Sequence, residues 1–220
     1  MSVYSISRRR SLLGSMSVNS IIILVNVVAF ILFTTLISLN NGFIDYVAIK
    51  PSSILAGKYL WTFVTSMFMH GGLFHLFANM FSLFFIGSLV EKILGSKRFL
   101  WFYMISGLAA GLLFVLSGLV FPSGMNTYAV GASGALFGLV GLLMLLTPNL
   151  PVYIMFIPIP IKMKYAAPGI LILLWLISIA GNVPIGNTAH LGGLIVGIVY
   201  GIYLRKKYKN RVAMLGRRFS

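Results

Sequence analysis

The chain has 220 residues, of which 59% are hydrophobic and only 9% are charged. A soluble domain carries about 25% charged residues, so this composition excludes an ordinary soluble protein and predicts an all-α membrane protein. There is no cysteine, which excludes disulfides and thiolate chemistry.

The net charge of +15 could suggest a nucleic-acid partner, but the basic residues gather at the ends of apolar stretches. Such placement is typical of the positive-inside rule and also attracts anionic lipid head groups. We therefore expect a lipid bilayer around the chain and no nucleic acid. The clusters are Arg8 to Arg10, then Lys92 with Lys97 and Arg98, then Lys162 with Lys164, and the tail from Arg205 to Arg218.

Six apolar stretches predict six transmembrane helices in one bundle. If all six cross, the four basic clusters lie on one side, so both termini are expected in the cytoplasm and the protein in the cell membrane. The expected organisation is a basic N-terminal segment at 1–17, a six-helix domain at 18–204 and a basic tail at 205–220. The expected helices are Val18–Leu39, Leu73–Val90, Phe99–Val120, Ser133–Leu146, Tyr165–Ala180 and Thr188–Leu204.

Two connecting segments are apolar without being expected to span. Asn40–Gly72 mixes apolar and polar residues around Trp61, so we expect it outside and partly in the membrane interface. Leu150–Ile161 is broken by three prolines, which predicts an interfacial loop rather than a seventh helix.

Three polar side chains are expected at one depth. Ser133 lies 15 residues before Pro148, His190 lies 15 before Arg205, and His75 lies 16 before Glu91. At 1.5 Å per residue, each rises about 22–24 Å from the cytoplasmic boundary. Because a polar group in lipid is costly, these residues indicate a submerged site that opens to water from outside.

The expected helix faces agree with this site. His75 and Asn79 share a face, as do Ser133 and Phe137. If the face of His190 packs on the helix of Ser133, His190 can accept a hydrogen bond from the serine while Phe137 braces the imidazole. Ser133 also begins its helix, where its own free N–H can bind an oxyanion.

Other chemistries lack the residues that they need. No His-Glu-x-x-His string exists for a metalloprotease, so no metal or other cofactor is expected. An aspartyl protease needs two membrane aspartates, whereas Asp45 is the one aspartate and lies in the outer segment. Glu91, beside Lys92, is expected to be a structural anchor. A serine with histidine as general base remains, without an acid to orient it.

Four motifs in this order resemble the rhomboid family of intramembrane serine proteases, and the resemblance runs from about Trp61 to Tyr203. They are His70-x4-His75-x3-Asn79, Glu91-x3-Gly95, Gly131-x-Ser133-Gly134 and Ala189-His190-x2-Gly193-x3-Gly197.

The resemblance implies Ser133 as nucleophile, His190 as general base, and His75 with Asn79 as oxyanion donors, supported by Phe137, His70 and Glu91. It also implies single-pass membrane proteins as substrates, cut within or near the outer part of the membrane. Two departures limit it. Thr62 follows Trp61 where some members have arginine, and Phe137 stands where tyrosine often occurs, so only ring stacking carries over there.

A membrane protein that is not an enzyme, such as a small transporter or a rhomboid-like chaperone, is the alternative. For an enzyme, a substrate helix also needs an entrance. The helix at Tyr165–Ala180 contains Pro168 and lacks the glycine stripe of its neighbours, so we expect loose packing there. We predict that this helix and the loop Gly181–Gly186 form a lateral gate and its cap.

Overall fold

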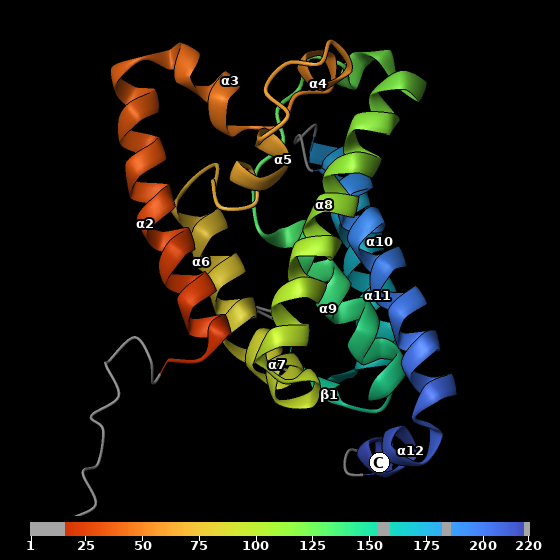
Figure 1. Cartoon of the computed structure of the whole chain (residues 1–220). Coiled ribbons are helices and arrows are strands. Elements are labelled where there is room, and N and C mark those ends of the chain that lie inside the picture. The colour runs from red at the N-terminus through yellow and green to blue at the C-terminus, as the bar shows by residue number, and fades with distance from the viewer. Residues whose placement is uncertain (1–15, 154–158, 182–185, 218–220) are drawn as a thin grey trace, which may run out of the picture.

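The computed structural model describes residues 16–153, 159–181 and 186–217, and regular structure in these ranges is nearly all helical. The long helices stand side by side as one bundle (Figure 1). They are α2 (Val18–Leu39), a run formed by α6 (Leu73–Ser82), the π-helical turn η2 (Leu83–Gly87) and α7 (Ser88–Leu94), then α8 (Ser96–Val120), α9 (Ser133–Leu146), α10 (Met163–Gly181) and α11 (Asn187–Lys207).

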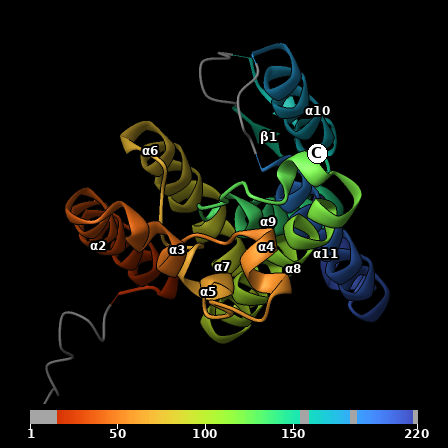
Figure 2. The ribbon, with the colours of Figure 1, turned by 90° about the horizontal axis from the view of Figure 1, so that it is seen from above.

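Five of these helical runs are long and apolar enough to cross a membrane, whereas α9 is shorter. Its 14 residues rise about 21 Å, less than the hydrocarbon layer of about 30 Å. Most of α9 is buried, because α8, α10 and α11 surround it (Figure 2). A helix whose neighbours are protein rather than lipid need not match the thickness of the bilayer.

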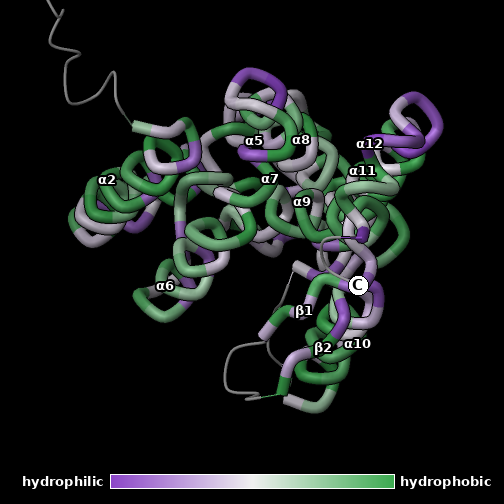
Figure 3. Tube along the Cα trace, turned by 90° about the horizontal axis from the view of Figure 1, so that it is seen from below, coloured by the Kyte–Doolittle hydropathy of each residue, from purple (hydrophilic) through white to green (hydrophobic). Residues whose placement is uncertain are grey.

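The first and fourth predicted helices have the predicted bounds, and the other helices extend beyond theirs. The helix predicted at Leu73–Val90 continues to Leu94 and contains the π-turn. The basic tail forms a further helix, α12 (Lys209–Arg217), which is the most hydrophilic helix in Figure 3. The start of α2 and α12 lie at the same end of the bundle (Figure 1).

Close contact between α9 and α11 forms the centre of the fold. Gly193 and Gly197 of α11 lie against the backbone carbonyls of Gly134 and Gly138 in α9, so that a side chain at either α11 position would overlap them. Small residues allow such an approach, in which packing and weak Cα–H···O contacts hold helices together in lipid.

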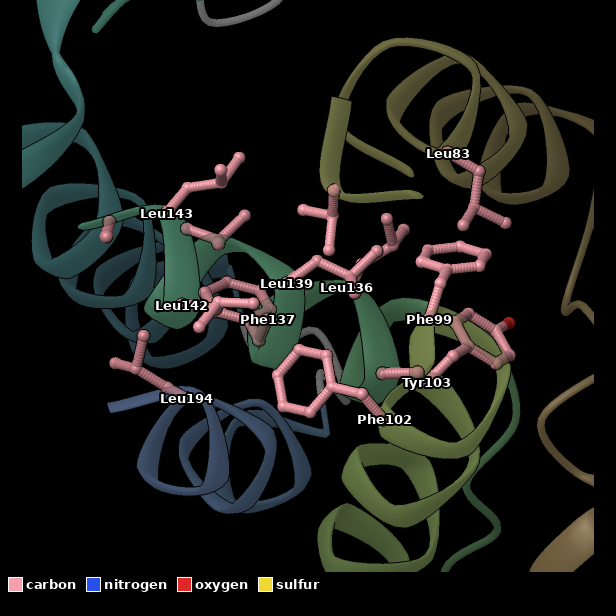
Figure 4. Close-up of a cluster of buried hydrophobic side chains, with 14 of the residues drawn as sticks. Leu83, Phe99, Phe102, Tyr103, Leu136, Phe137, Leu139, Leu142, Leu143 and Leu194 are labelled. Atoms are coloured by element: carbon pink, nitrogen blue, oxygen red, sulfur yellow. The ribbon is translucent and has the colours of Figure 1, made fainter. Parts of the chain in front are cut away.

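An apolar cluster continues this contact toward the end of the bundle where α2 begins. Leu139 and Leu142 of α9 are fully buried within it. Figure 4 shows them with Phe102 from α8 and Leu194 from α11. The buried side chains of α9 point in every direction around the helix. They therefore pack α9 against α8, α10 and α11 at the same time.

The segment Asn40–Gly72 folds over the other end of the bundle in short pieces. Trp61 is half-exposed and donates its indole N–H to the carbonyl of Tyr46 at 3.0 Å. Ile49 pairs with Ala129 through two backbone hydrogen bonds of 3.1 and 2.9 Å. This pairing ties the segment to the loop that precedes α9. The short elements are η1 (Asn41–Phe43), α3 (Ile44–Val47), α4 (Pro51–Leu55), α5 (Thr62–Thr65) and, after α8, η3 (Pro122–Gly124).

The described ends of the connection between α9 and α10 form a short pair of strands where the sequence predicted a loop. β1 (Pro151–Val152) pairs antiparallel with β2 (Ile161–Lys162), because the flanking residues bring the ends of the connection together. The centre of the predicted interfacial loop, at 154–158, lies outside the described residues, as does the centre of the predicted cap at 182–185.

We predict that Gly193→Ala destabilises the bundle, because the added methyl group overlaps the carbonyl oxygen of Gly134. Overpacking of this kind costs about 1–3 kcal/mol or more, and thermal unfolding in detergent measures it. Gly169→Ala is the matched control, because an added methyl group at this exposed position of α10 meets no atom within 4 Å. Equal unfolding temperatures for the two variants would contradict the prediction.

Candidate active site

Ser133 and His190 come together where α9 and α11 both begin. Ser133 is the first residue of α9, and His190 lies in the first turn of α11. The adjacent contact between Gly134, which follows Ser133, and Gly193, about one turn after His190, sets the distance between the two helices. As a result, Ser133 Oγ lies 2.8 Å from His190 Nε2, within the reach of a nucleophile and its general base.

No carboxylate orients the imidazole in the described part of the chain. His190 is buried, and its Nδ1 has no hydrogen-bond partner there. The ring is instead held by stacking on Phe137, with centroids 4.6 Å apart and planes inclined by 21°. This arrangement is a serine–histidine pair braced by an aromatic ring.

The loop before Ser133 needs a glycine for two reasons. Gly131 has a φ of +121°, a conformation that side chains rarely adopt. An added Cβ would also lie 2.9 Å from His75 Nε2, and 3.7 Å from Ser133 Oγ. The imidazole of His75 therefore lies close to the loop that precedes Ser133.

His70 contacts the backbone of the same loop. The side chain is fully buried, and the backbone N–H of Ala132 points at its Nε2 over a long 3.5 Å. Its ring meets the ring of His75 edge-on, with centroids 5.1 Å apart. Burial, with a smaller contribution from His75, lowers the pKa of His70 to about 3, so the ring is neutral and can accept this hydrogen bond.

Asn79 is buried one helical turn below His75. Its Nδ2 donates to the carbonyl of His75 at 2.8 Å, and its Oδ1 has no partner among the described residues. Because an amide nitrogen carries two hydrogens, one remains beyond this bond within the helix. Asn79 thus lies beside His75 and uses one amide hydrogen to bind the carbonyl of His75.

Glu91 lies away from this site, at the other end of the bundle. Its carboxylate accepts the backbone N–H groups of Val18 and Asn19, each at 2.9 Å, and the hydroxyl of Ser96 at 2.6 Å. A carboxylate at a helix N-terminus satisfies free N–H groups and favours the helix dipole. Glu91 therefore joins the starts of α2 and α8 to α7, which agrees with the predicted anchor.

The sequence did not indicate a second polar cluster, which holds the loop before α9. The hydroxyl of Tyr128 donates to Asp45 at 2.6 Å, and Lys50 lies 3.9 Å from the same carboxylate. The hydrogen bond to Asp45, together with partial burial, raises the pKa of Tyr128. Local spacing could not predict this cluster, because the pairing of Tyr128 with Asp45 spans 83 residues. In the described ranges, no three potential metal ligands gather at one point.

A partly buried serine–histidine pair within a helical membrane bundle is an arrangement that hydrolytic chemistry in a membrane can use. The sequence model of the Rhomboid domain matches residues 57–207, and the chain belongs to the rhomboid family. The family supports a function of the intramembrane protease type.

Named relatives agree with the family. RHOMBOID-like protein 1 of Arabidopsis thaliana is 39% identical over 70% of this chain and 37% of the relative. Rhomboid protein 1, mitochondrial, of Saccharomyces cerevisiae is 29% identical over 80% of this chain and 49% of the relative. The Inactive RHOMBOID-like protein 8 of Arabidopsis thaliana is 33% identical over 62% of this chain and 36% of the relative. The chain thus spans about half or less of these relatives, and the family includes a member named as inactive.

Proposed function

We propose that this chain is an intramembrane serine endopeptidase that cleaves single-pass membrane proteins by a Ser133–His190 dyad. The observation that carries the proposal is the 2.8 Å distance between Ser133 Oγ and His190 Nε2. An unassisted serine is a poor nucleophile at neutral pH, so a buried imidazole at this distance has a clear chemical use.

In the proposed reaction, Ser133 Oγ attacks the carbonyl carbon of the scissile peptide bond while its proton passes to His190 Nε2. The imidazolium then gives this proton to the leaving amine as the C–N bond breaks, which leaves an acyl group on Ser133. Water enters, loses a proton to His190 and attacks the acyl carbon, and the serine leaves with that proton. Phe137 keeps the ring in place through both halves.

Negative charge develops on the carbonyl oxygen in each tetrahedral intermediate. The backbone N–H of Ser133, at the start of α9, is one proposed donor to this oxygen. The imidazole of His75, beside Gly131, and the second N–H of Asn79 are the others. Preorganised donors of this kind are often the largest single contribution to catalysis.

We propose six crossings, with both termini in the cytoplasm of a cell whose plasma membrane holds the protein. The basic clusters support this orientation through the positive-inside rule. The dyad then lies in the outer part of the membrane, where the helical substrate must unwind locally before its carbonyl is accessible. Residues such as glycine and proline near the cut should favour cleavage, because they weaken a helix.

We further propose that substrates enter between α6 and α10. The buried residues of α10 all lie near its start, at Met163, Ala166 and Ala167. Its outer half therefore packs loosely, and it stands apart from α6 in Figure 2. On α6, Phe74 and Phe77 are exposed apolar side chains that a substrate helix can contact.

A non-enzymatic membrane protein that binds helices is the second candidate. One relative that is similar in sequence is named as inactive. Sequence similarity alone therefore does not separate a protease from a protein that only binds helices. The retained Ser133 and His190 favour the protease.

We predict that Ser133→Ala and His190→Ala each abolish cleavage of a purified membrane substrate in proteoliposomes, because either change removes half of the dyad. Ser82→Ala is the matched control, since among the described residues its hydroxyl donates to the carbonyl of Ala78 in its own helix and to no other group. Substantial cleavage by Ser133→Ala protein would rule out the protease.

His75→Ala and Asn79→Ala should lower kcat by ~10–1000-fold without abolishing it, because they remove donors to the oxyanion rather than the nucleophile. We expect KM to change little. Steady-state cleavage in proteoliposomes separates the two constants, and wild-type kcat in both variants would show that the oxyanion assignment is wrong.

Joining α6 to α10 should block membrane substrates. Cysteines introduced at the exposed positions Phe74 and Ile179 can be linked with a reducible thiol reagent, because the chain has no native cysteine. We expect cleavage to stop when the link forms and to return on reduction. Unchanged cleavage by fully linked protein would exclude entry at this place.

A further inference from the structure

The helical run that carries His75 and Asn79 contains a π-helical turn at Leu83–Gly87. Such a turn adds one residue to the helix, which rotates the two flanking segments by about 100° relative to a continuous α-helix. The outer segment, α6, carries His75 and Asn79, and the inner segment, α7, is anchored through Glu91. The π-turn therefore decides which way the two donor residues face.

One side chain from another helix spans this turn. Asn19, in the first turn of α2, is 1% exposed. Its Nδ2 donates to the carbonyl of Leu83, where the π-turn begins, at 2.8 Å, and to the hydroxyl of Ser88, just after its end, at 3.1 Å. Both hydrogens of one amide thus connect the two ends of the turn.

Gly87 leaves room for the amide of Asn19, because it has no side chain. A methyl group at Gly87 would overlap Asn19 Oδ1 and lie 2.8 Å from its Cγ. The backbone of Asn19 is itself fixed, because its N–H binds Glu91 at 2.9 Å. The position of the amide is therefore determined on both sides, by Glu91 and by Gly87.

Apart from its connection to the π-turn, α6 buries few side chains against the rest of the bundle. Asn79 is the one buried residue of α6, and its large apolar side chains such as Phe77 and Phe81 are exposed. The inner end, by contrast, packs on α8 through Val90, which is fully buried. The orientation of α6 thus depends strongly on the turn from which it rises.

We infer that Asn19 is a positioning residue that holds the π-turn and so aims His75 and Asn79 at the carbonyl bound beside Ser133. The activity readout of this inference rests on the proposed function. The orientation of α6 can also be measured without any substrate.

The test compares Asn19→Leu with Asn26→Leu in the full chain in proteoliposomes. Asn26 is an equally buried asparagine seven residues along the same helix, and its amide donates to the carbonyl of Ile22 and lies beside Tyr103 of α8, with no hydrogen bond to the π-turn among the described residues. We expect Asn19→Leu to lower kcat by about 10–100-fold, as loss of oxyanion donors does, with KM within about twofold of wild type. Asn26→Leu should keep wild-type kcat.

Spin labels provide the second readout. Cysteines at the exposed positions Phe77 in α6 and Leu116 in α8 allow a distance measurement in this cysteine-free chain. Asn19→Leu should shift or broaden that distance and Asn26→Leu should not. The inference is overturned if the distance is unchanged in Asn19→Leu, or if both variants lose kcat equally.

A double-mutant cycle covers the case in which Asn19→Leu does not fold. Gly87→Ala should lower kcat in the wild-type chain, because it displaces the amide, but add nothing in Asn19→Ala, where the methyl group has room. Additive effects overturn the inference. If the wild-type chain cleaves no substrate, the proposed function fails, and the spin-label distance alone then decides about Asn19.

Discussion

The close approach of α9 and α11 is the contact on which the proposed chemistry depends. Gly193 and Gly197 bring the second helix against the backbone of the first, with Gly134 and Gly138 on the other side. Lipid supplies no hydrophobic force to bring helices together, so van der Waals contact between smooth surfaces must do it. Ser133 and His190 each lie in the first turn of their helix. The glycine contact between the helices therefore brings the two side chains within hydrogen-bond distance.

Both carboxylates of the chain serve structure rather than catalysis. Glu91 joins the starts of α2 and α8 to α7, and Asp45 holds Tyr128 in the loop before α9. Neither reaches His190, whose Nδ1 has no partner in the described ranges. In soluble serine proteases an aspartate fixes the imidazole, whereas here stacking on Phe137 and burial between α9 and α11 restrict its motion.

The sequence indicated which residues could form the candidate site, but it did not indicate the long-range contacts that position them. Helical spacing sufficed to place Phe137 on the face of Ser133 and His75 on the face of Asn79, since both are local relations. The π-turn at Leu83–Gly87 was not predictable, because its stabilising partner, Asn19, lies 64 residues from Leu83. The same holds for the pairing of Ile49 with Ala129, which no local pattern encodes. Long-range polar contacts of this kind depend on the packed bundle and therefore cannot be read from spacing alone.

The most direct test of the dyad needs no substrate and no knowledge of the pathway. A fluorophosphonate reacts with a serine whose hydroxyl is activated by a neighbouring base and whose reaction site stabilises an oxyanion. Intact-mass and peptide mass spectrometry of the treated chain should find one adduct, on Ser133, and the adduct should be absent when His190 is replaced by alanine. An unmodified chain, or labelling of Ser133 at the same rate without His190, would contradict the account.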